Sequence, residues 1–130
     1  YSRNHEVAIE GKPRLNGSSD PAFRGDLSRH TPEDMLVSAL STCHMLWYLH
    51  LCAVNNVVVT QYIDEAEGNM TENQDGSGQF TTVTLRPRVR VTDASMVEKA
   101  LSLHQRANEM CFIARSVKFP VEHDPEITVG

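Results

Sequence analysis

A stretch of twenty residues without a charged side chain is the feature that most limits what this chain can fold into. Residues 35–54 contain no Asp, Glu, Lys or Arg, in a chain of 130 residues. Their apolar side chains surround nearly the whole circumference of a helix, which is stable in water only when other elements cover most of its sides. The stretch also contains Ser41, His44 and His50, which are poorly suited to lipid. We therefore expect a buried central helix and no membrane partner.

Local signals mark both ends of this helix. Thr31 can serve as its N-cap residue, and Pro32 suits the first helical position, where its missing N–H costs nothing. Glu33 and Asp34 then place negative charge in the positive first turn. The Asn55-Asn56 pair follows the apolar stretch and predicts the end of the helix.

The other segments predict short strands and one further helix. Val57–Glu67 and Phe80–Thr92 alternate apolar and polar side chains around a polar turn, which indicates a β-hairpin. Residues 11–30 are rich in Gly, Pro, Ser and Asp and allow two interpretations, a second strand or a functional loop. The remaining expected elements are a strand within residues 1–10, a helix from Thr92 or Asp93 to about Asn108, and a last pair of strands at 117–121 and 127–129. This order predicts an α+β domain with mostly antiparallel sheets packed around the long helix.

Size and charge exclude some functions. The length predicts one domain over residues 1–130, and the missing initial methionine before Tyr1 suggests that the N-terminus is truncated. No export signal is visible. The net charge is −5 and the twelve Lys and Arg are scattered, which argues against a nucleic-acid partner.

Three cysteines form an odd and sparse set, unlike a disulfide framework, which indicates a reducing, cytoplasmic environment and thiols kept for chemistry. Cys43, in the middle of the predicted helix, could simply pack as a small apolar side chain. The flanking Ser41 and Thr42, and the position of Cys111 just after the second helix, favour an attacking thiol with a distant resolving thiol. We interpret Cys52, nine residues after Cys43, as a packed bystander.

A metal site is one alternative, because cysteines and histidines crowd the same helix. Cys43 and His50 share a helix face, but they lie seven residues, or about 10 Å, apart. A metal ion needs ligands three or four positions apart on a helix. We therefore expect no metal, and we interpret His44 and His50 as buried or partly buried structural histidines.

Four segments resemble the OsmC/Ohr family of organic hydroperoxide reductases. Residues 32–45, PEDMLVSALSTCHM, are similar to the family helix, in which a Pro-Glu pair opens the helix and the reactive cysteine follows the Glu by ten positions. Residues 111–117, CFIARSV, are similar to the second-cysteine segment, although many members have Cys-Pro-Ile there. Residues 64–68 and 84–87 resemble the intervening hairpin. The resemblance covers nearly the whole chain and favours OsmC-like members over Ohr proper.

The resemblance implies a role for each matching residue. Cys43 would be the peroxidatic cysteine, Cys111 the resolving cysteine, and Glu33 the carboxylate that holds an active-site arginine. The N-terminal strand offers Arg3 as that arginine, and the following loop offers two alternatives, Arg24 and Arg29. The resemblance also implies an OsmC-like fold, an intertwined homodimer with sites at its interface, an external dithiol as reductant, and no metal or flavin cofactor.

The expected chemistry explains these residue types. A cysteine thiol has a pKa near about 8.5, so a nearby cation is needed to favour the thiolate that attacks a peroxide. An arginine oriented by a carboxylate supplies that charge. The resulting sulfenic acid would condense with the second thiol to a disulfide. The apolar side chains expected to favour alkyl or lipid hydroperoxides over hydrogen peroxide are Met45, Leu46, Trp47 and Phe112.

Helix geometry adds an expectation about assembly. Ten residues at about 1.5 Å each separate Glu33 from Cys43 by about 15 Å along one helix, too far for one arginine to contact both. Either the helix is interrupted or the acid comes from a second subunit, and we favour the second subunit. A competing hypothesis is a non-enzymatic dimeric module that binds an apolar small molecule, in which Cys43 and Cys111 are only part of the core.

Overall fold

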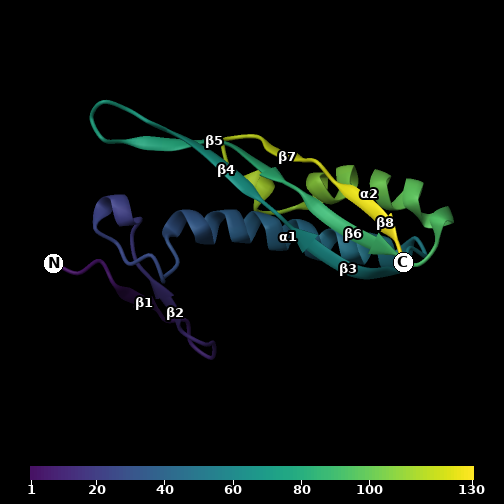
Figure 1. The fold of residues 1–130 in the computed structure, drawn as a ribbon, viewed down its shortest axis with the longest axis horizontal. Coiled ribbons are helices and arrows are strands. Elements are labelled where there is room, and N and C mark those ends of the chain that lie inside the picture. The colour runs from purple at the N-terminus through teal and green to yellow at the C-terminus, as the bar shows by residue number, and fades with distance from the viewer. The chain divides into compact units, whose positions relative to one another are not determined.

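The computed structural model describes residues 1–130 and divides into two compact units, Tyr1–Ser38 and Ala39–Gly130 (Figure 1). In the first unit, β1 (His5–Val7) pairs antiparallel with β2 (Leu15–Gly17), and a 3-10 turn, η1 (Pro21–Phe23), follows. Of the two interpretations of residues 11–30, the second strand is therefore the one that the structure supports. The turn between β1 and β2 includes Gly11, whose φ of 79° favours glycine.

Helix α1 (Pro32–Val54) begins and ends where the sequence predicts. The Asp34 amide donates to Thr31 Oγ1 and the Thr31 amide donates to Asp34 Oδ2, each at 3.0 Å, so the two side chains form a reciprocal cap. At the other end, Asn55 Nδ2 donates to the Leu51 carbonyl at 2.8 Å and Asn56 adopts a left-handed φ of 60°. The helix is continuous over all 23 residues.

Within the second unit, the cover expected on most sides of α1 is supplied along one side only. Its fully buried residues form one stripe with a spacing of four: Leu40, His44, Tyr48 and Cys52. By length and composition α1 could cross a membrane, and core helices of soluble proteins meet the same criterion. Only 22% of the most apolar 18-residue window of α1 is buried. The chain supplies covering elements for one side of this helix only, so apolar side chains such as Leu46, 64% exposed, face outward.

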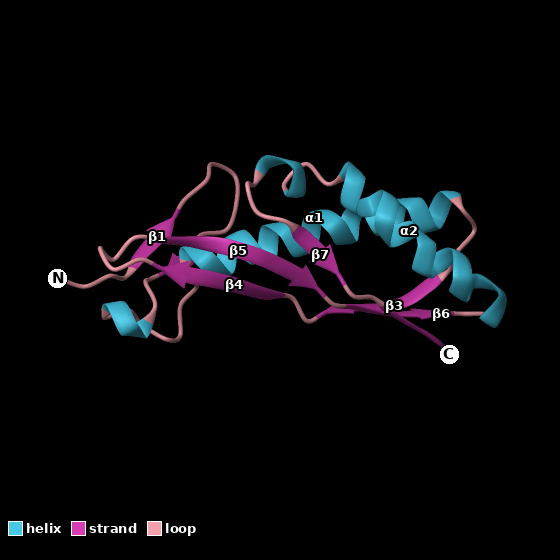
Figure 2. Ribbon diagram, turned by 90° about the horizontal axis from the view of Figure 1, so that it is seen from above, coloured by secondary structure: helices cyan, strands magenta, loops and turns pink.

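In the second unit the predicted hairpin is present, but both of its strands are broken once. β3 (Val59–Asp64) pairs with β6 (Pro87–Val91), and β4 (Glu67–Glu72) pairs with β5 (Gly78–Leu85), both antiparallel. Figure 2 shows the two halves as one long ribbon. The break is held by Asp64, whose Oδ1 accepts a hydrogen bond from the Arg86 amide at 2.7 Å.

The expected pairing of the last two strands with each other is wrong. β7 (Val121–His123) pairs in parallel with β5, and β8 (Glu126–Val129) pairs in parallel with β6. Val83 faces Val121 and Arg88 faces Glu126, an offset of 38 residues in both cases, so the register continues across the break. The C-terminal segment is therefore a single interrupted strand that follows the interrupted hairpin strand, and the α+β fold has mixed sheets.

Helix α2 (Val97–Met110) covers the same side of the ribbon as the second-unit part of α1 (Figure 2). A short turn, η2 (Ala94–Met96), leads into it, and Asp93 caps this turn by accepting from the Ser95 amide at 2.8 Å. The helix predicted from Thr92 or Asp93 is thus confirmed. The main core cluster comprises Tyr48, Cys52, Val57, Val89, Val91, Ala100, Leu103 and Ala107.

A stack of histidines lies beside this core. His44 of α1 and His104 of α2 are 1% and 0% exposed, and their rings are nearly parallel with centroids 5.3 Å apart. The ring of Tyr48 stacks on His104 at 3.8 Å, and the ring of His123 of β7 lies 6.0 Å from His44. Burial lowers the pKa of His44 to about 4 and that of His104 to about 3, and the neighbouring imidazoles add to both shifts. Both side chains are therefore neutral at pH 7.

The buried histidines predict that acid destabilises the fold. The pKa of each histidine is near 6.5 in the unfolded chain and lower in the folded protein. As the pH falls below 6.5, the unfolded chain therefore binds more protons than the folded protein does. The free energy of unfolding should therefore fall by about 1.4 kcal/mol per pH unit for each histidine between about pH 6 and pH 5. Urea unfolding across this range measures the slope. His44→Gln with His104→Asn should reduce the slope, and an equal slope in the intact protein and this variant would contradict the prediction.

Candidate active site

The fold brings together two cysteines that lie 68 positions apart in the sequence. Cys43 is half-buried on α1, and Cys111 is buried at the residue that follows α2. Both are free thiols, and they lie close enough together for the Cys43 side chain to raise the pKa of Cys111. Two cysteines can be bridged only where their side chains already lie close together. Cys43 and Cys111 meet this first requirement for a disulfide.

The backbone after α2 holds Cys111 in place. The Cys111 amide donates to the Asn108 carbonyl at 3.4 Å, and its carbonyl accepts from the Arg115 amide at 3.1 Å. The Ala114 amide donates to Cys111 Sγ at 3.4 Å, at the start of the short turn η3 (Ala114–Ser116). Three hydrogen bonds thus fix both the main chain and the sulfur atom of this residue.

Burial makes the two thiols chemically different. Burial, together with the neighbouring Cys43 side chain, raises the pKa of Cys111 to about 11. Cys111 therefore stays protonated at neutral pH and is a poor nucleophile. Cys43 is the more accessible of the two sulfurs. The geometry thus suits Cys43 as the thiol that meets a substrate and Cys111 as the thiol that reacts afterwards.

The arginine and glutamate expected at the site both lie in the first unit. Arg3 Nε donates to the Phe23 carbonyl at 3.4 Å, and the guanidinium lies 3.9 Å from the centre of the Tyr1 ring. Its Nη1 is buried without a hydrogen-bond partner. Glu33 is exposed in the first turn of α1, and within this unit it forms no ion pair with Arg3. Arg3 therefore keeps an unused donor, and Glu33 an unused carboxylate.

The two alternative arginines are placed differently. Arg29 is occupied within its own unit, because Nη1 donates to the His5 carbonyl at 3.0 Å and Nε lies 3.8 Å from Asp26 Oδ2. Arg24 is exposed and ends the η1 turn with a left-handed φ of 66°. Of the three candidates, Arg3 is the one with a buried unpaired nitrogen, and its role remains a prediction.

The continuous helix removes one of the two explanations for the spacing between Glu33 and Cys43. Because α1 is not interrupted, about 15 Å along its axis separates the two residues. The role of a carboxylate from a second subunit stays a prediction.

Ser41 has a different role from the one that its position beside Cys43 suggests. Its hydroxyl donates to Asp64 Oδ2 at 2.5 Å, and Asp64 also accepts from the Arg86 amide. Ser41 therefore ties α1 to the break in the hairpin. The contact was not predictable from the sequence, because it depends on where the long strands break.

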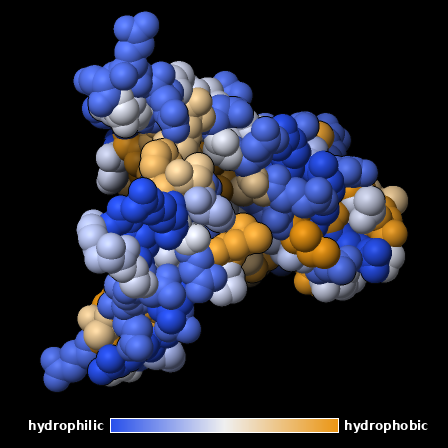
Figure 3. Space-filling view, turned by 60° about the vertical axis from the view of Figure 1, so that its left-hand side comes forward, coloured by the Kyte–Doolittle hydropathy of each residue, from blue (hydrophilic) through white to orange (hydrophobic).

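Apolar side chains predicted near the thiols are only partly brought together. Trp47 contacts Phe112 edge to face, with ring centres 6.3 Å apart, and Phe112 directly follows Cys111. A pocket of about 280 Å³ is lined by Trp47, Leu46 and His50. Met45 is half-buried, while Leu46 and Phe112 are exposed. The surface carries separate apolar patches, orange in Figure 3, among hydrophilic side chains.

The cysteines and histidines that crowd α1 differ in how deeply they are buried. No group of three or more His, Cys, Asp or Glu side chains is arranged to hold a metal ion. His44 and Cys52 are buried, as expected for packed residues, whereas His50 is exposed and the expectation that it is at least partly buried is wrong.

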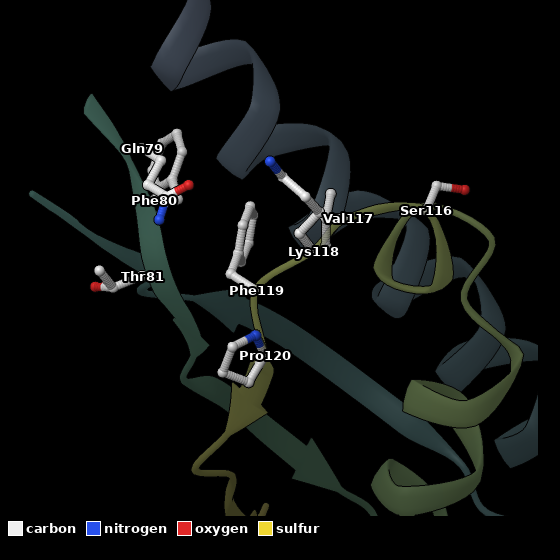
Figure 4. Close-up of a pocket in the computed structure, with 8 residues that line it drawn as sticks. All are labelled: Gln79, Phe80, Thr81, Ser116, Val117, Lys118, Phe119 and Pro120. Carbon is white, nitrogen blue, oxygen red and sulfur yellow. The ribbon is translucent and has the colours of Figure 1, made fainter. Parts of the chain in front are cut away.

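A larger cavity, of about 720 Å³, was not predicted from the sequence. Residues of β5 line one side, and the segment between η3 and β7 lines the other (Figure 4). The rings of Phe80 and Phe119 contact each other, with centres 5.4 Å apart, and both line the cavity together with Lys118. The cavity depends on the parallel pairing of β7 with β5, for which the sequence has no local signal.

The difference between the thiols predicts the order of alkylation. With limiting iodoacetamide near neutral pH, Cys43 should be modified before Cys111 and Cys52, because both of the latter are buried and burial raises both pKa values. Peptide mass mapping at early times measures the order. Faster labelling of Cys111 than of Cys43 would contradict the assignment of Cys43 as the accessible thiol.

Comparison with known proteins identifies the family and the fold of the chain. The profile of the family described as OsmC-like protein matches residues 25–126. A solved OsmC-like protein of unknown function from Vibrio cholerae O1 biovar eltor is 32% identical, with a TM-score of 0.88 over 97% of this chain and 86% of that one. No curated protein matches the sequence.

Two further solved structures share the fold at low identity. An organic hydroperoxide resistance protein from Elizabethkingia anophelis is 13% identical, with a TM-score of 0.71 over 98% of this chain and 90% of that one. An organic hydroperoxide resistance protein OsmC from Legionella pneumophila is 12% identical, with a TM-score of 0.62 over 97% and 96%. At these identities the likeness shows the fold alone.

Proposed function

The chain belongs to the OsmC-like protein family, and from this premise we propose that it is a thiol-dependent peroxidase that reduces organic hydroperoxides to alcohols. The observation that carries the proposal is the close approach of half-buried Cys43 to buried, protonated Cys111. The two hydroperoxide resistance proteins among the fold neighbours support the choice of substrate class.

The proposed reaction has three steps. The Cys43 thiolate attacks the terminal oxygen of ROOH, the O–O bond breaks, and the alkoxide takes up a proton and leaves as ROH. The Cys111 sulfur then attacks the Cys43 sulfenic acid, its proton joins the departing hydroxide, and water leaves as the disulfide forms. An external dithiol reduces this disulfide by thiol exchange and is itself oxidised. The protein needs no metal or flavin for these steps.

In the proposed assembly two copies cover each other's α1 helices in an intertwined homodimer. The apolar side of α1 that its own chain leaves uncovered, which includes Leu46, supports this arrangement. The site would then combine Cys43 and Cys111 of one chain with Glu33 of the other, and Glu33 would orient Arg3 toward the thiolate. We place this enzyme in the cytoplasm, where cellular dithiols keep the cysteines reduced.

A second candidate function is a non-enzymatic module that binds an apolar small molecule. The cavity of about 720 Å³ favours it, since this volume suits a small ligand and two phenylalanine rings face into it. In that case the Cys43→Ser variant would still bind the ligand, and the intact protein would not consume a hydroperoxide.

Cysteine substitutions should separate these two functions. We expect Cys43→Ser to abolish consumption of an alkyl hydroperoxide in the presence of a small dithiol, because no other thiol is accessible at the site. Cys111→Ser should lower turnover by at least about tenfold, because the sulfenic acid then lacks its partner. A coupled assay of hydroperoxide loss, with hydrogen peroxide alongside, measures both.

The matched control is Cys52→Ser, which removes a thiol that lies outside the pair and should keep most of the turnover. A faster rate with the alkyl substrate than with hydrogen peroxide is expected from the apolar flank of Trp47 and Phe112. If the intact protein consumes neither peroxide with any dithiol, the binding module becomes the better account.

The shared site predicts complementation between two inactive variants. Glu33→Gln and Cys43→Ser homodimers should each be inactive, but a mixed dimer would join the Cys43 of one chain to the Glu33 of the other. After random exchange, half of the dimers are mixed and one of their two sites is intact, so about a quarter of the intact activity should return. No recovery on mixing, with exchange verified by mass spectrometry, would contradict a site built from two chains.

A further inference from the structure

The two cysteines form one layer of an ordered contact between α1 and α2. Cys43 meets Cys111, His44 meets His104, and Tyr48 donates its hydroxyl hydrogen to the Ala100 carbonyl at 2.8 Å. Residue numbers rise along α1 while their partners' numbers fall along α2, so the helices run antiparallel. The histidine layer is therefore next to the thiol layer, and His44 directly follows Cys43 in the sequence.

The histidine layer is joined by one directional contact. His44 Nε2 and His104 Nδ1 lie 3.0 Å apart, and both side chains are buried. A neutral imidazole has one donor and one acceptor nitrogen, so one ring donates to the other. The outer nitrogens, His44 Nδ1 and His104 Nε2, are buried without any partner. Two tautomeric arrangements satisfy this single bond, and either leaves one donor and one acceptor unpaired.

This arrangement is costly for stability alone. A buried polar atom without a partner destabilises a fold by about 1–3 kcal/mol, whereas a pair of apolar side chains would fill the same space without that cost. What an apolar pair lacks is direction, because it tolerates small sliding or rotation of one helix past the other. A hydrogen bond between two rings tolerates little of either.

The position of Cys111 depends on this relation between the helices. Its sulfur and main chain are fixed by hydrogen bonds from Ala114, Arg115 and Asn108, so it moves with the end of α2. A slip by one residue displaces a helix by about 1.5 Å, enough to remove two sulfurs from bonding geometry. Other groups near the histidine pair are the Tyr48 and His123 rings, which stack on it and do not hydrogen-bond to it.

We propose that the His44–His104 hydrogen bond is a positioning contact that holds α1 and α2 in the register at which the Cys43 and Cys111 sulfurs meet, so that these two histidines set how readily the disulfide forms. The proposal rests on the attacking and resolving roles assigned above to the two cysteines. Neither histidine touches the substrate, and both act through the placement of the thiols.

The test is the equilibrium of the Cys43–Cys111 disulfide in buffers of reduced and oxidised glutathione, measured by thiol trapping and mass spectrometry in a Cys52→Ser background. The ratio of the disulfide form to the dithiol form at a known glutathione ratio gives the effective concentration of one thiol toward the other. An asparagine amide reaches about the position of imidazole Nδ1, so His104→Asn should keep the bond and stay within about twofold of the background protein. The longer side chain in His104→Gln places its amide too far along, and the double variant His44→Leu with His104→Leu has no polar atom at this contact. Both variants should therefore lower the effective concentration by about tenfold.

The comparison separates positioning from general damage. Circular dichroism and urea unfolding identify any variant that fails to fold. If the double leucine variant fails to fold, His104→Asn and His104→Gln still compare a kept with a lost hydrogen bond. Equal effective concentrations in the asparagine and glutamine variants, or an unchanged value in a folded leucine pair, would overturn the proposal. The equilibrium needs no hydroperoxide turnover, so failure of the peroxidase activity and failure of the positioning role give different results.

Discussion

The structure depends on how a long apolar helix is covered. Helix α1 has a capped start and a defined end, and between them it offers apolar side chains in all directions. The ribbon of broken strands and α2 cover one stripe of it, which contains Leu40, His44, Tyr48 and Cys52. The side left open is the reason to expect a second copy of the chain, and α1 would then serve both as the core of one chain and as the interface with the other.

The same packing makes two identical thiols behave differently. Cys43 lies at the edge of the covered stripe and stays accessible, while Cys111 lies at the end of α2, where burial raises its pKa to about 11. A protonated thiol beside an accessible one suits a reaction in which one sulfur is oxidised first and the other closes the bond. The distinction requires no charged group on α2, since removal from water is sufficient.

Features encoded by neighbouring residues could be predicted from the sequence. The reciprocal cap of Thr31 and Asp34, the end of α1 at Asn55, and the hairpin all follow from local patterns and are present. The parallel partners of β7 and β8 could not be predicted, because alternation within a strand does not say which strand lies beside it. The meeting of Cys43 with Cys111 was suggested by resemblance to a family. The adjacent His44–His104 bond had no signal, because nothing in the spacing of two single histidines links them.

The proposed reaction consumes one hydroperoxide molecule for each pair of thiols. The most direct measurement is a single turnover, in which the fully reduced protein receives one equivalent of an alkyl hydroperoxide without any dithiol, and its cysteines are then mapped by mass spectrometry. We expect one alcohol per chain and a disulfide between Cys43 and Cys111, with Cys52 still reduced. Oxidation centred on Cys52, or a protein that stays fully reduced while the hydroperoxide persists, would contradict it.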